Sequence, residues 1–576
     1  MIILKLTIDG GLNMLKTYKS FFLPLFLVVS YALGNTQVSG TVTNKDGEAL
    51  SYANISVLGL NVGTASSEDG TFTLKMPSEF KFGDSVVLKA GYIGYKSSEK
   101  TLVLEGPDNV LNFSLEADVL GVEEVVVTAL GISKSKKALG YSVQDIKSDE
   151  LNMVQQDNIV DALSGKVAGV QVLGSAGASL GGSAKIRLRG ANGMSDTQPL
   201  WVVDGTPLDN TSFSDAYSGR DYGNMANDIN MDDIESVSVL KGASASALYG
   251  SRAANGVILV TTKKGSSKKK GMGISYSVTT TNENILVLPE YQNEYAGGYT
   301  QDWITAVDPE DGQTYNILNY AADESWGPKM DGTMYRPWWS WIHADFTGDG
   351  VDDYGTEIPL LPQENNVKDF FADGVSTVHS VTLDGGSDIS SYRLSIKSNN
   401  ANGVIPNSSL EKSNVGFNGS LNLTSRLTSS LSLNYANTKG FGRPASGYSP
   451  SQGNPLQSFN QWFQRQLDMD KLRQYRGEDG SIYSWNMRSV SDQRPLYWDS
   501  PFFSLYENVS EDERNRLFGN FSLRYQQSAN LVLESTVRTD MYDFVIEDRL
   551  GSGGLETDFY SMEKLSLREM NYENRA

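Results

Sequence analysis

The sequence predicts a mainly β chain with three parts: an N-terminal β-sandwich, a mixed α/β segment, and the first strands of a transmembrane antiparallel β-barrel. Glycine (56), tyrosine (28) and phenylalanine (21) are abundant, whereas charged residues make up only 20% of the chain. This composition is typical of β-rich proteins and not of disordered tails or coiled coils. In the second half of the chain, apolar and polar residues alternate in strand-length runs, and the connections between the runs are alternately short and long.

The charge balance and two rare residue types exclude several functions. The chain has 48 Lys+Arg and 69 Asp+Glu, so its formal net charge is −21. Such acidity argues against nucleic acid as a partner, since that affinity depends on basic side chains. There are no cysteines and only two histidines, His343 and His379. Disulfides, thiolate metal sites and a cysteine nucleophile are therefore excluded, and we expect no catalytic residues and no required cofactor.

Residues 1–34 are predicted to be a secretory signal peptide, with translation starting at Met1 or Met14. Lys16 and Lys19 precede an apolar run that is shorter than the roughly 20 residues of a membrane-spanning helix. Small residues at the end of the run place the cleavage near Gly34 and Asn35. The alternative is a buried N-terminal helix.

Residues 35–116 alternate in short strands that are separated by turn sequences such as Asp46-Gly47 and Asp69-Gly70. Short strands at this spacing predict a small β-sandwich. The linker that follows, residues 117–140, contains the segment EEVVVTALG. Its β-forming run can be added to the sheet edge of another protein, or it is an ordinary edge strand of the sandwich. The residues concerned are Glu123, Glu124, Val125, Val126, Val127, Thr128 and Ala129.

Residues 141–265 are glycine-rich and mix helix with strand. A short helix is predicted over Ile159–Leu163, and strands are predicted in IRLRG, PLWVVDGTPL, IESVSVLKG and VILVTTKKG. Gly165-Lys166 is followed by Val167, where a phosphate-binding loop needs Ser or Thr. The glycines thus do not indicate a nucleotide site.

The rest of the chain, residues 271–576, alternates apolar and polar residues in runs near the 9–11 residues that a tilted membrane strand needs. A sequence with one apolar and one polar face suits lipid outside a barrel and water inside it. The predicted strands are 273–283, 375–384, 391–398, 413–424, 429–438, 515–526 and 531–541, with a possible eighth near 557–568.

The connections separate a membrane barrel from a soluble sandwich. Tight turns at 385–390, 425–428 and 527–530 alternate with excursions at about 285–373, 399–413 and 439–514. Outer-membrane barrels have short periplasmic turns and longer extracellular loops, and each tight turn falls on the same side. A closed barrel of about eight strands is filled by its own side chains, so it could not hold a folded segment such as residues 141–265. We therefore expect this chain to be an N-terminal part of a longer protein.

The order of these parts resembles the SusC/RagA family of TonB-dependent outer-membrane transporters of Bacteroidetes. The strings that carry the resemblance are VSGTVTNKDGEALSYANISVLG, VVVTALG, LSGKVAGVQV, IRLRGANG, PLWVVDGTPLD, DIESVSVLKGASASALYGSRAANGVILVTTKKG, ESWGPKMDG and NQWFQRQLDMDKL. The resemblance implies a carboxypeptidase regulatory-like sandwich over 35–116, a TonB-box linker over 117–140, a plug over 141–265, and part of a barrel of about 22 strands.

The resemblance also implies a function and partners. TonB and its motor complex would capture Glu124–Ala129 by strand addition, and the pull would open a path past the plug. The expected cargo is an oligosaccharide or a peptide, and the expected partners are a SusD-like surface lipoprotein and outer-membrane lipid. Alternatives are a ligand-binding signalling receptor, a secreted enzyme with an adhesive β-domain, and a truncated product that does not transport.

Two features of the first long excursion are candidate binding sites. Aromatic rings at Trp326, Tyr335, Trp338, Trp339 and Trp341 suit stacking on sugars; the alternatives are that they pack the loop or contact a protein partner. The string DFTGDGVDD resembles half of a calcium loop, although position 12 is Thr356 instead of Glu. Its candidate calcium ligands are Asp345, Thr347, Asp349 and Asp353, and a merely acidic turn is the alternative.

Overall fold

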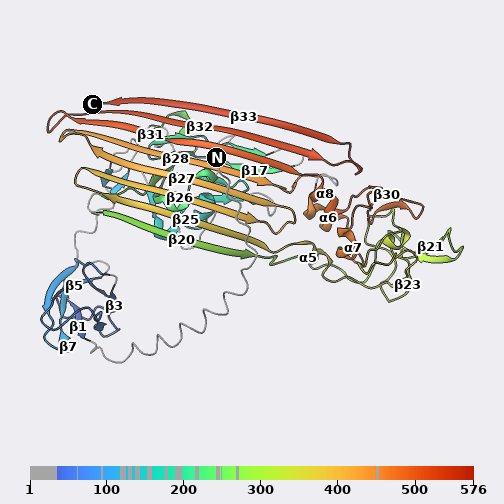
Figure 1. Ribbon diagram of the computed structural model, residues 1–576, viewed down its shortest axis with the longest axis horizontal. Coiled ribbons are helices and arrows are strands. Elements are labelled where there is room, and N and C mark those ends of the chain that lie inside the picture. Colours follow the sequence, from blue (N-terminus) through green and yellow to red (C-terminus); the bar gives the residue numbers. More distant parts are fainter. Residues whose placement is uncertain are drawn as a thin grey trace, which may run out of the picture. The chain divides into compact units, whose positions relative to one another are not determined.

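The computed structural model of the chain comprises two compact units, residues 1–124 and 125–576 (Figure 1). Each unit has its own core and is considered separately below. The structure describes residues 36–60, 62–92, 95–116, 125–127, 133–135, 143–151, 158–174, 180–188, 198–214, 219–241, 245, 247, 249–266, 271–448 and 453–576. The predicted signal peptide, with its cleavage site near Gly34 and Asn35, lies outside the described residues.

The first unit is the predicted β-sandwich. One sheet has the strand order β4-β1-β7, with β8 also paired to β1, and the other has the order β3-β2-β5-β6. Alternate residues point into the shared core, among them Val38, Ile55 and Phe72. The strands are β1 (Gln37–Asn44), β2 (Asn54–Val57), β3 (Gly63–Ala65), β4 (Thr71–Lys75), β5 (Ser85–Gly91), β6 (Ser98–Val103), β7 (Asp108–Val110) and β8 (Phe113–Leu115).

The second unit contains the mixed α/β segment, which we call the plug. Its central sheet has the order β11-β18-β19-β14-β15, and the predicted helix at 159–163 is α3 (Ile159–Ala162). Its other elements are β11 (Val143–Lys147), α2 (Ser148–Leu151), β12 (Val170–Leu173), β13 (Lys185–Leu188), β14 (Leu200–Val203), β15 (Thr206–Leu208), β16 (Ser212–Ser214), β17 (Asp221–Asn224), η3 (Met225–Asp228), η4 (Met231–Asp233), β18 (Ile234–Leu240), η5 (Ser251–Ala253) and β19 (Val257–Thr262).

An eight-stranded antiparallel sheet, which we call the wall, curves around the plug (Figure 1). It contains all seven strands that alternation predicts, and also the possible eighth. Its strands, in spatial order, are β20 (Gly271–Glu283), β25 (Gly374–Gly386), β26 (Ser390–Asn402), β27 (Ser409–Asn422), β28 (Leu427–Phe441), β31 (Ser510–Gln526), β32 (Val532–Leu550) and β33 (Phe559–Arg575).

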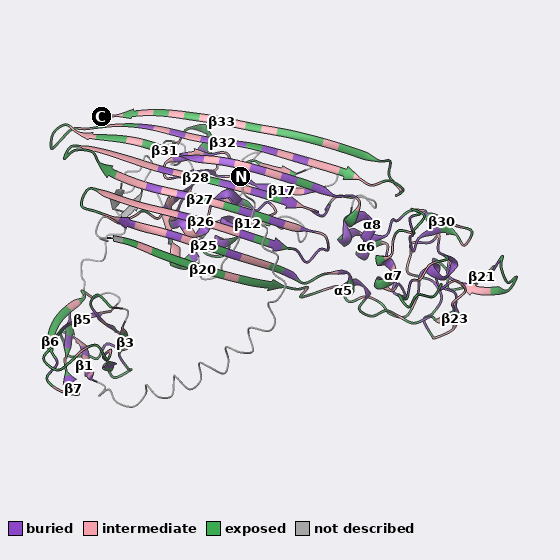
Figure 2. Cartoon of the chain, in the orientation of Figure 1, coloured by how far each residue is buried: buried purple, intermediate pink, exposed green. Residues whose placement is uncertain are grey.

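The wall distributes its polar and apolar residues in the reverse of the way a soluble sheet does: polar residues line its inner face and apolar residues its outer face. Inward side chains such as Ser395 (2% exposed) and Asn418 (7%) are buried against the plug. Outward side chains such as Leu421 (41%) and Phe521 (42%) are exposed. Buried residues alternate with more exposed ones along β25, β26, β27, β28, β31 and β32, whereas no described residue of the edge strands β20 and β33 is buried (Figure 2). An apolar outer face and a polar inner face are the pattern of a strand between lipid and an aqueous interior.

One predicted connection is wrong. The expected excursion at 399–413 is a short loop, residues 403–408, because β26 and β27 are longer than their apolar runs. Backbone pairing continues from the apolar part into polar sequence, with Asn400 opposite Glu411 and Ala401 opposite Leu410. Hydrogen bonding of the two backbones does not require an apolar face, so the alternation of residue types underestimates strand length here.

The long connections 284–373 and 442–509 pack together at one end of the wall, which we call the loop end; the opposite end is the turn end. Within the described residues, no helix combines the length and the apolar character needed to cross a membrane. The elements of the two loops are β21 (Ile304–Val307), β22 (Thr314–Ile317), β23 (Met334–Tyr335), η6 (Trp338–Trp341), β24 (Ile358–Pro359), α5 (Asn366–Phe370), α6 (Pro455–Gln461), α7 (Met469–Arg473), β29 (Met487–Ser489), β30 (Asp492–Pro495) and α8 (Pro501–Tyr506).

Candidate functional site

The predicted coupling segment is described only in part. Its central residues form β9 (Val125–Val127), which pairs antiparallel with β10 (Ser133–Ser135). Glu123, Glu124, Thr128 and Ala129 lie outside the described residues. The extended backbone of β9 is compatible with strand addition, and the role of the segment stays a prediction.

The plug is fixed to the wall by a buried group of charged side chains, which we call the clamp: Asp228 of the plug with Arg514, Arg516 and Asp540 of the wall. Arg514 donates from Nη2 to Asp228 Oδ1 at 2.7 Å and from Nε to both carboxylate oxygens at 3.1 Å. Arg516 Nη1 lies 3.4 Å from Asp228 Oδ2, and its Nε and Nη2 bind Asp540 at 2.8 and 2.7 Å. All four side chains are at most 2% exposed.

The remaining donors of Arg516 are directed at the plug backbone, whereas Arg514 Nη1 is buried without a hydrogen-bond partner. Arg516 also donates to the carbonyl oxygens of Met225 and Asp209, at 2.8 and 2.9 Å. Asp540 accepts from the backbone N–H of Asp209 at 2.9 Å. A buried ion pair is stable only when its geometry and its additional hydrogen bonds offset the cost of desolvation. Arg516 and Asp540 meet that requirement, and together with the Arg514–Asp228 pair they fix the plug to β31 and β32 of the wall.

A second set of charged contacts joins η4 of the plug to β26. Asp233 accepts from Arg393 Nη2 at 3.0 Å and from Ser395 Oγ at 2.5 Å. Lys397 Nζ lies 3.2 Å from Asp232 Oδ2. These groups are less deeply buried than the clamp, with side-chain exposures between 6% and 20% for the four charged residues.

The plug is also tied to the loop end. Arg443, just beyond β28, forms an ion pair with Asp512 and donates to the carbonyl oxygen of Leu180 at 2.7 Å. Arg220 of the plug binds Asp548 of β32 at 3.0 Å and the carbonyl oxygen of Asn508 at 2.9 Å. The part of the plug that faces the long loops is therefore bound to the bases of those loops.

Sequence reasoning did not identify the clamp. Its local signal is an arginine pair, Arg514 and Arg516, spaced by two on a strand and hence on one face. The predicted strand starts at 515, whereas β31 starts at Ser510, so the prediction includes only one arginine of the pair. The acidic partners Asp228 and Asp540 carry no local signal for this pairing.

Four of the five aromatic residues singled out in the first long loop are inside its core. Tyr335, Trp338, Trp339 and Trp341 are 3–5% exposed and pack with Phe346, Phe459 and Phe502, among others. Trp326 lies apart from them: it is 55% exposed, and its ring centroid is 4.7 Å from that of Tyr295. Contact of this set with a ligand or partner stays a prediction, and Trp326 is its only exposed member.

A fully buried arginine organises the same loop. The guanidinium of Arg336 forms an ion pair with Asp308 and lies 3.7 Å from the ring centroid of Trp341 and 4.5 Å from that of Tyr354. Such cation–π contacts strengthen when they are desolvated. Arg336 therefore links three segments of the loop around one buried charge.

The carboxylates of the candidate calcium loop bind backbone N–H groups. Asp345 accepts from Gly348 and Gly350 at 2.6 and 2.7 Å, and Asp353 accepts from Phe346 and Thr347 at 2.7 and 2.8 Å. Asp349 accepts from Val351. Among the residues that the structure describes, no group of three acidic, histidine or cysteine side chains is placed to hold a metal ion. Calcium binding by Asp345, Thr347, Asp349 and Asp353 stays a prediction.

Comparison with known families places two parts of the chain. Residues 135–257 match the family described as TonB-dependent Receptor Plug Domain. Residues 38–127 match the family described as CarboxypepD_reg-like domain. These ranges correspond to the plug and to the N-terminal sandwich.

Curated relatives are TonB-dependent receptors. The chain is 31% identical over 414 residues to TonB-dependent receptor SusC of Bacteroides thetaiotaomicron, covering 72% of this chain and 34% of that protein. It is 27% identical over 510 residues to TonB-dependent receptor P26 of Formosa agariphila, covering 87% of this chain and 42% of that protein. The chain thus spans about a third to two fifths of the length of these relatives.

Solved structures share the fold. The RagAB peptide importer in its 'open-open' state matches with a TM-score of 0.54 and 21% identity, over 78% of this chain and 46% of that chain. The 'closed-closed' state of RagAB gives a TM-score of 0.51 and 20% identity, over 76% and 45% of the two chains. At 21% and 20% identity, both similarities concern the fold alone.

Proposed function

We propose that this chain, which belongs to the SusC/RagA type of TonB-dependent receptors, acts in the energised import of a nutrient across the outer membrane. The observation that carries the proposal is a plug fixed by buried Asp228 inside a wall with an apolar outer face and a polar inner face. The plug occupies the interior through which a solute would pass. Import therefore requires a force that rearranges its contacts with the wall.

The segment around β9 would receive that force. Strand addition uses the N–H and C=O groups of the backbone, so it gives a firm hold with little dependence on side chains. In this proposal TonB pairs with residues 123–129 on the periplasmic side. The turn end of the wall then faces the periplasm, and the loop end faces the outside of the cell.

We propose an oligosaccharide as the cargo, with a peptide as the alternative, and a SusD-like lipoprotein as the partner at the loop end. Trp326 supports the first choice, because its exposed ring lies beside that of the partly buried Tyr295 on the first long loop. RagAB, which shares the fold, is described as a peptide importer, and this supports the alternative.

The test is a backbone substitution in the native cell. Val126→Pro removes the N–H of the central β9 residue, whereas Val126→Thr keeps it in a residue that also favours strands. Cells carrying each variant would be grown on single oligosaccharides and peptides, with the amount of protein in the outer membrane measured in parallel. We expect Val126→Pro to abolish growth on one substrate while Val126→Thr supports it. Equal growth of both variants on every substrate would refute the proposal.

A further inference from the structure

Two buried ion pairs follow one another along β31. Asp512 and Arg514 both face the plug and are 1% and 2% exposed. Asp512 pairs with Arg443 of the long connection 442–509, and Arg514 pairs with Asp228 of the plug. Residues two apart on a strand lie on one face, about 7 Å apart. A contact of the long loops and a contact of the plug therefore occupy neighbouring positions of one strand.

Arg443 binds both carboxylate oxygens of Asp512. Its Nε donates to Oδ1 and its Nη2 donates to Oδ2 at 3.1 Å, and both side chains are at most 3% exposed. In the adjacent strands β28 and β32, the register partners of Asp512 and Arg514 are all uncharged. These partners are Gly440 and Ile546 for Asp512, and Thr438 and Phe544 for Arg514. Arg514 is thus the next cation along this face of β31.

Arg514 has one group of donors without a partner. Its Nε and Nη2 bind Asp228, whereas its Nη1 is buried without a hydrogen-bond partner. A buried N–H group without a partner is unfavourable, so a second carboxylate within reach would stabilise Arg514. Asp512 is the neighbouring acid on the same strand face, but its oxygens are bound to Arg443.

The position of Arg443 depends on the long loops, because it lies just beyond β28 at the start of the connection 442–509. A shift of this loop base withdraws Arg443 from Asp512. The carboxylate is then left buried and unpaired, which is strongly unfavourable. Arg220, at the same end of the plug, is already bound to Asp548. Arg514 is therefore the cation that Asp512 attracts.

We propose that Asp512 and Arg514 form a partner-exchange switch between the long loops and the plug. When loop movement withdraws Arg443, Arg514 turns from Asp228 to Asp512. Of its ion pairs, Asp228 then keeps the one with Arg516, at 3.4 Å, so the hold of β31 on the plug is weakened. The inference rests on the proposed import function and adds the means by which the outer loops control release of the plug.

The first test removes Arg443 and then the charge that attracts Arg514. Hydrogen exchange of residues 225–233 reports the attachment of the plug, and it is measured on the purified protein without TonB or substrate. We expect Arg443→Met to raise exchange at these residues at least tenfold. Adding Asp512→Asn should bring it back to within twofold of the wild type, because Arg514 then has no second carboxylate to bind. Exchange that stays raised in the double variant, or that is unchanged in Arg443→Met, would overturn the switch.

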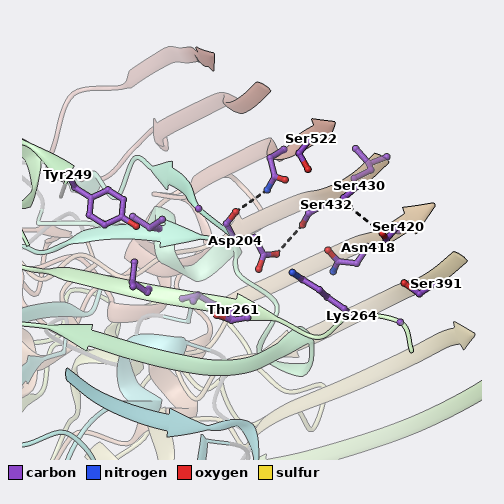
Figure 3. Close-up of a pocket in the computed structure, with 18 residues that line it drawn as sticks. Asp204, Tyr249, Thr261, Lys264, Ser391, Asn418, Ser420, Ser430, Ser432 and Ser522 are labelled. Atoms are coloured by element: carbon purple, nitrogen blue, oxygen red, sulfur yellow. Dashed lines mark hydrogen bonds between the residues drawn. The ribbon is translucent and has the colours of Figure 1, made fainter. Parts of the chain in front are cut away.

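The control is Ser432→Ala, at an attachment of the plug that uses neutral donors. Ser432 Oγ donates to Asp204 Oδ2 at 3.0 Å, and Asn520 Nδ2 donates to the carbonyl oxygen of Asp204 at 3.1 Å (Figure 3). We expect Ser432→Ala to raise exchange near Asp204 and to leave residues 225–233 unchanged. An equal rise at residues 225–233 in Ser432→Ala and Arg443→Met would show a general loosening of the plug and would overturn the switch.

A second test asks whether Arg514 has already left Asp228 in Arg443→Met. Asp228→Asn is introduced into the wild type and into Arg443→Met. We expect it to raise exchange of residues 225–233 at least tenfold in the wild type and less than twofold in Arg443→Met, because coupled residues give non-additive effects. Equal effects in the two backgrounds would overturn the switch. Growth of cells with Val126→Pro tests the import function separately, since these exchange rates require neither TonB nor a substrate.

Discussion

Arg514 of the wall and Asp228 of the plug form a buried ion pair, with 2.7 Å between Nη2 and Oδ1, although 286 residues separate them in the chain. Together with Arg516 and Asp540, this pair holds the plug at mid-wall. Nearer the turn end, Asp204 is held by the neutral donors Ser432 and Asn520. The wall thus holds Asp204 through neutral donors only, whereas it holds Asp228 and Asp233 through ion pairs, and under a pull we expect the contacts of Asp204 to yield first.

Asp228→Asn should loosen the attachment of the plug. The change leaves the charges of Arg514 and Arg516 buried with one carboxylate fewer, and loss of one member of a buried ion pair costs about 3–5 kcal/mol. We expect trypsin to cleave the plug at a clearly lower urea concentration than in the wild type. The control is Arg252→Gln, which removes a plug–wall ion pair to Glu569 whose side chains are 53% and 27% exposed. Exposed pairs contribute about 1 kcal/mol or less, so equal sensitivity of the two variants would contradict the assigned role of the clamp.

Arg336→Met should destabilise the long loops while leaving the wall intact. The substitution keeps much of the side-chain volume but leaves Asp308, which is 2% exposed, without its cationic partner. We expect faster hydrogen exchange across residues 304–360 and a red shift of tryptophan fluorescence as the loop core admits water. Arg494→Met, which removes a surface pair with Asp492, is the control. Unchanged exchange in Arg336→Met would show that the aromatic packing alone holds the loop.

The sequence predicts the wall well because the signal is local. In β27, Val415, Phe417 and Leu421 alternate with polar neighbours, and that period alone defines a strand with two different faces. The same argument predicts seven of the eight strands and gives the eighth, near 557–568, as a possibility. It underestimates β26 and β27, because their backbones stay paired beyond the apolar part.

The site could not be predicted in the same way. Whether Trp338 faces solvent or a core depends on residues such as Phe346, which packs on both Trp338 and Tyr483 of the other long loop, more than 100 residues away. Asp228 likewise acquires its role only when η3 is set against β31. Such pairings across the fold have no periodicity, so residue types at one position do not reveal them.

His343 should make the first long loop more stable at mildly acidic pH. Its Nδ1 lies 2.7 Å from Asp352 and its Nε2 lies 2.9 Å from Glu310, and these two hydrogen bonds raise the pKa of His343. A raised pKa in the folded state gives stability that is fully present below the unfolded pKa of about 6.5 and is lost as pH rises through the folded value. The side chain is 56% exposed, so salt screens the effect.

The measurement for His343 is hydrogen exchange of residues 343–354 at pH 5.5 and 8.5, corrected for the intrinsic rates. We expect stronger protection at pH 5.5 in the wild type, and no such difference in His343→Gln. High salt should reduce the difference in the wild type. Protection that does not depend on pH would contradict a stabilising role for the charged imidazole.

The charge of Asp499 should have the opposite effect to that of His343: it should lower the stability of the loops. Burial raises its pKa to about 6, although its carboxylate accepts from the backbone N–H of Leu555 at 3.1 and 3.2 Å. An acid whose folded pKa exceeds its unfolded value, about 3.9, lowers stability progressively as pH rises between those two values. The penalty at neutral pH is on the order of 3 kcal/mol.

Asp499→Asn removes the charge and keeps an acceptor for Leu555, so we expect it to raise the unfolding midpoint of the loops at pH 7.5 but not at pH 3.5. Ser500→Ala, which alters the N-cap of α8 next to it, is the control and should lower the midpoint at both pH values. A pH-independent effect of Asp499→Asn would show that its carboxyl group is already neutral, or already compensated, at pH 7.5.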